Sequence, residues 1–478
     1  MEAISQIRRP LEPPPMKVYC ESAVDSTDVE PTVIPTRTIT PAKIDPDALK
    51  IVRRLRKFGY AAYLVGGCVR DLLLRRHPKD FDVATEAKPN DLRKLFRNCR
   101  LIGRRFRLAH IYFREKVIET ATFRAAAQEV KEGQEDLLIR SDNVFGTEQE
   151  DANRRDFTIN ALFYDPVNRT LIDYVGGLED LVERVIRFIG KPDVRTREDP
   201  VRILRAIKFA GLLDFSIEPE TWQAIVDYRF ELQKCAPPRI LEEIFKILKG
   251  GRAEDTIRLM WRAGVLEVIL PEVAAYLSRA LERGEERDPG AGLFAYLRAL
   301  DQMDRSELSH SVLISCLVLH PTMDVIGSQE CAAYQVPDAL TTQWDVSGCL
   351  LQRMVERLRL PKWEAERIQQ LITTQRRLFG MRKNQPVPHA LLCRSYFGEA
   401  LDLFEIGVHA TRDGMPTLRQ LRAALHQATP KKGPTAHPRR SPSPPAAPAP
   451  TDERPRSRSP RRRRRSRHRA AAPQPTEG

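Results

Sequence analysis

The sequence has no C-x-x-C pair, no cysteine and histidine group at zinc-site spacing, and no apolar run near the length of a membrane span. Its eight cysteines are scattered between Cys20 and Cys393, which predicts reduced thiols and no structural metal. A spanning helix needs about 20 apolar residues, so no transmembrane segment is predicted. The N-terminal stretch MEAISQIRRPLEPPP has prolines where a secretory signal needs an apolar core. We therefore expect a cytoplasmic protein that does not bind membranes.

Positive charge is concentrated at the C-terminus. The chain has 478 residues and a formal net charge of +14. From Lys431 onward there are 14 Lys and Arg residues against 3 Asp and Glu residues, so this stretch carries +11 and everything before it +3. A basic tail on a nearly balanced body indicates an arm that binds a polyanion, and nucleic acid is the leading partner class.

Composition and periodicity divide the chain into five segments. Residues 1–44 are rich in Pro, Thr and Asp without sustained periodicity, which predicts a flexible leader. Over 45–190 short strand-like runs alternate with helical spacing, including a helix expected from Thr147 to Asn160, and predict a small α/β unit. Strand signals then fade, so we expect a helical neck over 191–255 and a helical body over 256–428. Residues 429–478 have too few apolar groups to offset chain entropy and are predicted to be disordered.

A glycine pair followed by two acids carries the clearest chemical signal. Gly66 and Gly67 lie at a predicted strand-to-helix junction, where the backbone can approach a phosphate closely. Arg70, in the first helical turn, would reach a triphosphate. Asp80 and Asp82 are predicted to share one face of a strand, and two converging carboxylates suit Mg²⁺. Each motif alone also fits a tight turn or an exposed strand, but their order and the basic helix between them favour a two-metal site.

The same stretch resembles a known family. Residues 63–85, YLVGGCVRDLLLRRHPKDFDVAT, are similar to the head of class II tRNA nucleotidyltransferases and bacterial poly(A) polymerases. Two further matches follow in the same order, EDANRRDFTINALFYDP at 150–166 and REDPVRILRAIKFA at 197–210. The resemblance implies a polymerase-β-like α/β nucleotidyltransferase head with a small mixed sheet, followed by an all-helical neck and body. It also implies template-independent addition of nucleotides to RNA 3′ ends with release of pyrophosphate.

Further site residues follow from the second match. The resemblance places Arg154 and Arg155 near the triphosphate and Asp156 beside the active centre as a third acid. Two guanidinium groups offer planar donor forks that suit phosphate oxygens. Glu119, on a predicted strand, competes for the place of the third carboxylate because it could lie beside the acid pair in a sheet. The sequence leaves both assignments open.

The third match concerns selection of the base. A helix is predicted to begin at Asp199 and to place Asp199, Arg202 and Arg205 on one face. In the family, the matching acid and arginine read the base edge of the incoming nucleotide. An Asp acceptor and an Arg fork distinguish adenine from guanine because a wrong edge leaves buried polar groups unpaired. The alternative is an ordinary salt bridge within the helix. Where many relatives have a third arginine, this chain has Lys208.

One segment bears on which nucleotide is added. Leu101 to Ile111, LIGRRFRLAHI, resembles the poly(A) polymerase version of this region, and Asp142 to Thr147, DNVFGT, points the same way. The alternative is a turn with solvated charges and His110 as a core histidine. We expect AMP to be added from ATP with two Mg²⁺ ions. The other hypotheses are a CCA-adding enzyme and an RNA-binding protein with an inactive nucleotidyltransferase head.

The Arg-rich tail is expected to hold RNA through phosphate contacts that carry no sequence information. Its densest part is the run Arg461, Arg462, Arg463, Arg464 and Arg465. Binding of a protein partner is the alternative for this segment. We expect the chain to act as a monomer on RNA 3′ ends.

Overall fold

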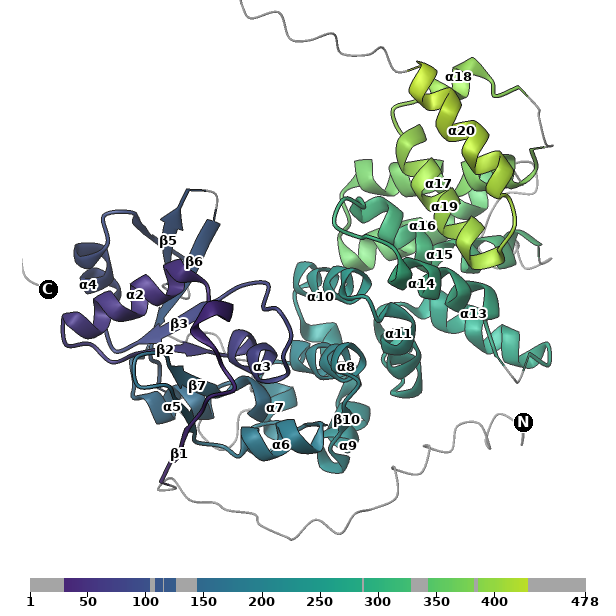
Figure 1. Ribbon diagram of the computed structural model, residues 1–478. Coiled ribbons are helices and arrows are strands. Elements are labelled where there is room, and N and C mark those ends of the chain that lie inside the picture. The colour runs from purple at the N-terminus through teal and green to yellow at the C-terminus, as the bar shows by residue number, and fades with distance from the viewer. Residues whose placement is uncertain are drawn as a thin grey trace, which may run out of the picture. The chain divides into compact units, whose positions relative to one another are not determined.

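The structure, a computed structural model, has a sheet-containing N-terminal part and a helical C-terminal part (Figure 1). It describes residues 30–103, 108–114, 116–125, 144–285, 288–327, 343–381 and 386–428. All of these belong to one compact unit, Met1–Ala428. The predicted class, an α/β head followed by helices, is confirmed. The finer division into neck and body stays a prediction, and the tail lies outside the described residues.

The head is built on an eight-stranded sheet with the order β1-β8-β7-β2-β3-β6-β5-β4. The strands are β1 (Thr32–Pro35), β2 (Ala62–Val65), β3 (Asp82–Thr85), β4 (Cys99–Ile102), β5 (Leu108–Phe113), β6 (Lys116–Thr122), β7 (Leu162–Asp165) and β8 (Thr170–Asp173). β3 and β6 are parallel, and the other neighbouring pairs are antiparallel. The register pairs Val65 with Asp82, so the glycines that follow β2 lie beside the acid that begins β3.

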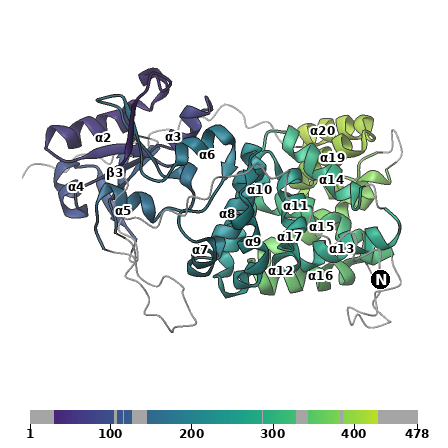
Figure 2. The same ribbon diagram turned by 90° about the horizontal axis from the view of Figure 1, so that it is seen from below.

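Alternation along the central strands gives the sheet two apolar faces. Leu64 and Val83 join a cluster that includes Leu55 of α2 (Pro46–Lys57). Val65 faces the other way and joins a cluster with Ala152 of α5 (Glu148–Asn153). Figure 2 shows α2 and α5 on opposite sides of β3. The remaining helices of the head are α3 (Gly67–Leu73), α4 (Pro89–Leu95) and α6 (Gly177–Glu183).

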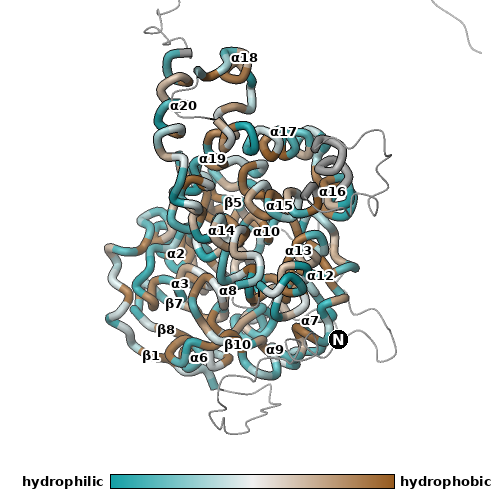
Figure 3. The backbone as a smooth tube through the Cα atoms, turned by 90° about the vertical axis from the view of Figure 1, so that its right-hand side faces the viewer, coloured by the Kyte–Doolittle hydropathy of each residue, from teal (hydrophilic) through white to brown (hydrophobic). Residues whose placement is uncertain are grey.

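Helices form the rest of the described chain. A short parallel pair, β9 (Val185–Ile186) and β10 (Ser216–Ile217), flanks the first two of them. These helices are α7 (Pro192–Glu198), α8 (Val201–Leu213), α9 (Pro219–Asp227), α10 (Pro237–Gly250), α11 (Ala253–Arg262), α12 (Leu266–Ile269), α13 (Pro271–Glu282), α14 (Ala291–Gln302), α15 (His310–Gly327), α16 (Gln343–Leu358), α17 (Lys362–Phe379), α18 (His389–Leu392), α19 (Phe397–Thr411) and α20 (Met415–Ala428). Figure 3 shows hydrophobic and hydrophilic residues alternating along these helices, as expected for helices with one buried face. None of the described helices has the length and apolar character needed to cross a membrane.

Three sequence expectations differ from the structure. The flexible leader was predicted to extend to residue 44, but Thr32–Pro35 form β1 because the outer edge of β8 offers unpaired backbone groups. A helix predicted from Thr147 to Asn160 ends at Asn153, since Phe157 is extended and bridges to Phe188. The third difference is at the acid pair, where the strand begins at Asp82 and leaves Asp80 in the exposed preceding segment.

Candidate active site

A cavity of about 540 Å³ lies where the ends of β2 and β3 meet α8 and α10. This volume is within the usual range for sites that bind small molecules. The predicted site residues in its walls are Gly66, Gly67, Arg70, Asp82, Arg155, Asp156, Asp199, Arg202 and Arg205. The other residues in its walls are Asn160, Val201, Phe209, Arg239, Glu242, Glu243 and Lys246. Among the described residues, Asp80, Glu119 and Arg154 are predicted site residues outside these walls.

Gly66 is required by the backbone and by its neighbours. Its φ of 75° lies in the left-handed region, which side chains with a Cβ rarely adopt. A Cβ there would also lie 3.2 Å from Nη1 of Arg155 and 4.0 Å from Oδ2 of Asp82. The glycine therefore lets the chain turn from β2 into α3 while an arginine and an acid approach its backbone.

An acidic cluster lies at the sheet end of the cavity. Asp82 is the register partner of Glu119 on the parallel strand β6. Burial first, and then the charges of Glu119 and Asp80, raise the pKa of Asp82 to about 6 against the opposing charge of Arg155. Glu119 in turn lies 3.5 Å from Nε2 of His110 on β5. Within the described part of the chain Asp82 has no ion-pair partner, so this end of the cavity carries uncompensated negative charge.

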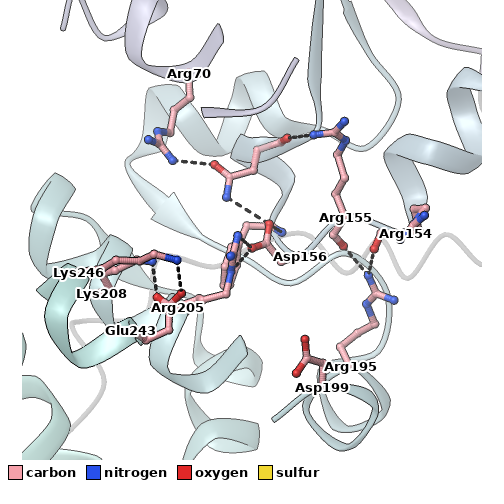
Figure 4. A network of polar contacts seen from close by, with 12 residues as sticks. Arg70, Arg154, Arg155, Asp156, Arg195, Asp199, Arg205, Lys208, Glu243 and Lys246 are labelled. Carbon is pink, nitrogen blue, oxygen red and sulfur yellow. Dashed lines mark hydrogen bonds and ion pairs between the residues drawn. The ribbon is translucent and has the colours of Figure 1, made fainter. Parts of the chain in front are cut away.

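Asp156 is in a different environment. Its carboxylate accepts hydrogen bonds from Nε of Arg205 at 2.7 Å, from Nδ2 of Asn160 at 3.2 Å and from the Phe157 N–H at 2.9 Å. Burial alone would raise its pKa, but the Arg205 and Arg202 charges and the Asn160 hydrogen bond hold the pKa at about 2. Figure 4 shows Arg205 directed at Asp156. The structure thus places Glu119 directly beside Asp82. Asp156 instead pairs with Arg205 and so connects α8 to the head.

Asn160 is a site residue that the sequence reasoning missed. Its Oδ1 accepts a hydrogen bond from Nη1 of Arg70 at 2.7 Å, and its carbonyl accepts one from Nη1 of Arg155 at 3.4 Å. Arg70 also lies with its guanidinium 4.9 Å from the centre of the Phe209 ring. The available signal was the place of Asn160 four residues after Asp156 in the same motif. Asn160 thereby orients both cavity arginines that the motifs predicted.

The base-reading residues are arranged differently from the prediction. Asp199 ends α7 and does not begin α8, whose first residue is Val201. A residue before a proline is disfavoured in helical conformation, and Asp199 precedes Pro200. Its carboxylate is held by both terminal nitrogens of Arg239, at 2.9 and 2.8 Å. The predicted shared face of Asp199, Arg202 and Arg205 on one helix is therefore wrong, although all three line the cavity.

The remaining neck residues are also paired. Arg202 is buried and donates to Oε2 of Glu198 at 3.0 Å. Lys208, the position where many relatives have arginine, is buried and forms an ion pair with Glu243 of α10. Lys246 binds the other oxygen of Glu243 at 3.1 Å (Figure 4). These contacts join α8 to α7 and to α10 at the wall of the cavity.

Several predicted residues fall outside the described part of the chain. They are Arg104 to Arg107, Asp142 and Asn143 of the nucleotide-discriminating segments, and Arg461 to Arg465 of the tail. Within the described ranges, no group of three or more His, Cys, Asp or Glu side chains is arranged to hold a metal ion.

Two sequence families match segments that contribute residues to this cavity, while the lining residues from Asp199 to Phe209 lie between the two matches. The family described as "Poly A polymerase head domain" matches residues 62–187, and "Probable RNA and SrmB- binding site of polymerase A" matches 214–277. Over these regions the chain is similar to the poly(A) polymerase and CCA-adding enzyme family. The first match contains the glycine pair, the acidic cluster and the two arginines that follow α5, so the matched head domain forms one side of the cavity.

Relatives of both branches of the family are found. Poly(A) polymerase I of Salmonella typhimurium is 43% identical over 305 residues, which are 62% of this chain and 64% of that protein. Poly(A) polymerase I of Escherichia coli O6:H1 is 47% identical over 265 residues, 54% of this chain and 57% of that protein. The CCA-adding enzyme of Bacillus velezensis is 34% identical over 235 residues, 49% of this chain and 58% of that protein. The chain spans less than two thirds of the length of each of these family members.

The family fold is also seen in solved structures. The crystal structure of the Bacillus stearothermophilus CCA-adding enzyme in complex with CTP matches with a TM-score of 0.59 and 26% identity. The match covers 80% of this chain and 83% of that enzyme, so it includes helical regions beyond the head domain.

Proposed function

We propose that this protein is a template-independent polynucleotide adenylyltransferase that adds AMP from ATP to RNA 3′ ends and releases pyrophosphate. The observation that carries the proposal is the uncompensated carboxylate of Asp82 beside Gly66 in a cavity of about 540 Å³. The higher identity to poly(A) polymerase I than to CCA-adding enzymes favours adenylate addition.

The acidic cluster fits divalent cations. Asp82 is mostly buried and repelled by two neighbouring acids, and it has no ion pair within the described residues, so a cation would stabilise its ionised form. Mg²⁺ takes one or two carboxylates and completes its shell with water and substrate phosphates, so it does not need three protein ligands. We assign Asp80 and Asp82 as the metal-binding acids. Two Mg²⁺ ions bound there would help activate the RNA 3′-hydroxyl and neutralise charge on pyrophosphate.

The third carboxylate is assigned to Glu119. It is the register partner of Asp82, whereas the carboxylate of Asp156 is occupied by Arg205 and Asn160. We propose that Asp156 acts by positioning Arg205 and does not contact the cations.

The arginines of the cavity would bind the nucleotide. Arg70 and Arg155 are oriented by Asn160, lie near the glycine turn and suit the triphosphate, and Arg154 precedes Arg155 in the chain. Asp199, Arg202 and Arg205 form the opposite part of the wall and would select the base. Since a base that leaves these polar groups unpaired binds poorly, their fixed positions would give the enzyme its nucleotide preference.

CCA addition is the second candidate. It is supported by the CCA-adding relatives and by the fold shared with the Bacillus stearothermophilus enzyme. The test supplies purified protein with Mg²⁺, an unstructured RNA and each nucleotide singly, and in parallel a tRNA that lacks its terminal CCA. We expect a ladder with ATP on the unstructured RNA. Equal ladders with CTP and ATP would overturn adenylate addition, and addition of C, C and A to the tRNA followed by arrest would establish CCA addition.

RNA is the proposed macromolecular partner. The match of residues 214–277 to a family described as a probable RNA and SrmB-binding site supports RNA contact by the helices after α8. We propose that the tail arginines add affinity through phosphates, in a cytoplasmic enzyme that acts as a monomer. Deletion of residues 431–478 should then reduce the salt dependence of RNA affinity. An unchanged dependence would contradict the proposal that the tail contacts RNA phosphates.

A further inference from the structure

Arg195 lies behind the wall of the cavity and joins its two functional sides. It is on α7, its side chain is 13% exposed, and the walls formed by the described residues do not include it. Its Nη2 donates to the carbonyl oxygen of Arg154 at 2.8 Å and also to that of Arg155. Figure 4 shows the guanidinium of Arg195 directed at the backbone of these two residues. The contact therefore fixes the segment that carries the proposed triphosphate arginines.

The same guanidinium is tied to the base-reading side. Nη1 of Arg195 donates to Oε2 of Glu198 at 2.9 Å, and Nη1 of Arg202 donates to the same oxygen at 3.0 Å. Nη1 of Arg202 also donates to the carbonyl oxygen of Arg195 at 3.0 Å. One carboxylate oxygen and one backbone carbonyl thus connect Arg195 to an arginine that lines the cavity.

An arginine is needed for this arrangement. The guanidinium is planar and presents donors in fixed directions, so a single side chain can bind two carbonyls and a carboxylate together. The two carbonyls lie at the end of α5, where backbone acceptors without helical partners favour a positive charge. Burial, followed by the charge of Arg202, lowers the pKa of Arg195 to about 10, so the side chain is still protonated at neutral pH.

We propose that Arg195 is a positioning residue that couples the triphosphate-binding segment at Arg154 and Arg155 to the base-selecting residue Arg202. The inference rests on the proposed nucleotidyltransferase function. Because Arg195 does not line the cavity, it would act through these residues and would not touch the nucleotide. Without the guanidinium of Arg195, the triphosphate and base subsites would move independently. ATP binding and nucleotide discrimination would then weaken together.

The test compares Arg195→Lys and Arg195→Gln with Arg197→Lys. Arg197 is a matched control because it is on the same short helix and its hydrogen bonds go to Asp193 within that helix. Thermal melting first identifies the folded variants. KM and kcat are then measured for ATP and CTP, and equilibrium affinities for both nucleotides are measured by competition against a fluorescent ATP analogue.

For both Arg195 variants we expect the KM for ATP to rise and the preference for ATP over CTP to fall, each by roughly 10- to 100-fold. Small misplacements of a bound substrate are known to have effects of this size. Arg197→Lys should stay within about twofold of wild type. The loss of ATP-binding free energy in the double variant Arg195→Lys with Arg155→Lys should be smaller than the sum of the losses in the two single variants, because both substitutions act on the same segment.

Two failures are distinguishable. If the wild-type protein extends no RNA with any nucleotide, the proposed function fails, and the affinity measurements still test Arg195. If Arg195→Lys and Arg197→Lys have the same ATP and CTP affinities, or if Arg195→Lys lowers only kcat, the coupling role is overturned.

Discussion

The two ends of the cavity treat buried charge in opposite ways. At the sheet end, Asp82 and Glu119 lie side by side on parallel strands, and burial raises the pKa of Asp82 to about 6. At the helical end, Asp156 is paired with Arg205 and its pKa is held at about 2. Paired charges keep helices in place, whereas uncompensated acids are costly unless a cation arrives. The contrast indicates that ion pairs within the protein already fix the helical end of the cavity. The acids at the sheet end, by contrast, have their charge balanced only when a cation binds.

The largest loss of activity is expected when the negative charge at the sheet end of the cavity is removed. Asp82→Ala with Asp80→Ala should lower nucleotide incorporation by on the order of 1000-fold or more, because bound metal ions supply several kcal/mol of transition-state stabilisation. RNA affinity should be largely retained, since the proposed RNA contacts lie mainly in residues 214–277 and in the tail. Single-nucleotide incorporation and filter binding measure the two properties.

Asp91→Ala is the matched control for that experiment. Asp91 is an acid of the head that pairs with Lys94 on the exposed surface of α4. Full activity in the double variant, or an equal loss in Asp91→Ala, would contradict the assignment of the acidic cluster.

The next effect concerns the helical end. Asp156→Asn should lower the free energy of unfolding by about 3 kcal/mol, at the low end for a broken buried pair because the Arg205 side chain is 36% exposed. Asp193→Asn, which removes an exposed intrahelical pair with Arg197, should change it by less than about 0.5 kcal/mol. Chemical denaturation measures both.

The pH dependence of this difference has a definite sign. The folded-state pKa of Asp156 is lowered to about 2 from the model-compound value of 3.8, so its stabilisation is present above pH 3.8. The gap between wild type and Asp156→Asn should therefore persist down to about pH 4 and shrink as the pH falls toward 2. A gap that vanished near neutral pH would contradict the pairing.

At the sheet end the sign is reversed. The pKa of Asp82 is raised in the folded protein, so without metal its ionised form destabilises the fold at neutral pH, and stability is gained as the pH falls through about 6. Mg²⁺ needs the ionised carboxylate, so its affinity should be about tenfold weaker at pH 5 than at pH 7. The Mg²⁺-induced rise in melting temperature measures this. The pH effect should be absent in Asp82→Asn, and its survival there would assign it to another group.

A small effect on stability is expected when an exposed pair at the helical end is removed. Arg239→Ala removes the partner of Asp199, and the Arg239 side chain is 53% exposed, so stability should fall by less than about 1 kcal/mol. The preference for ATP over other nucleotides should nevertheless decrease, because Asp199 would no longer be held in the wall. Arg252→Ala, which removes exposed pairs with Asp214 and Asp255, is the control and should leave the preference unchanged. An unchanged preference in both would argue that Asp199 does not select the base.

Local sequence was enough to predict much of this protein. The spacing of apolar residues predicted the sheet-containing head and the helices after it, and the motifs predicted nine residues that line the cavity. The predicted elements and the glycine turn follow from strand alternation and helical periodicity, which are properties of neighbouring residues, whereas Arg155 and Asp156 were implied by the family resemblance. The same local reasoning failed where a segment's conformation depends on a distant partner, as at Thr32–Pro35 and Asp199.

By itself, the sequence determined which chemical groups the chain carries and in what order: a glycine turn, two acids and clusters of arginines. Only the tertiary structure decided their partners. The strand register places Glu119 beside Asp82, and Asp156 forms its ion pair with Arg205. Folding also brings Arg195 within hydrogen-bonding distance of the carbonyls of Arg154 and Arg155. The physical reason is that a carboxylate or a guanidinium can pair with many groups of opposite charge, and the choice among them is made by folding, which fixes distance and burial.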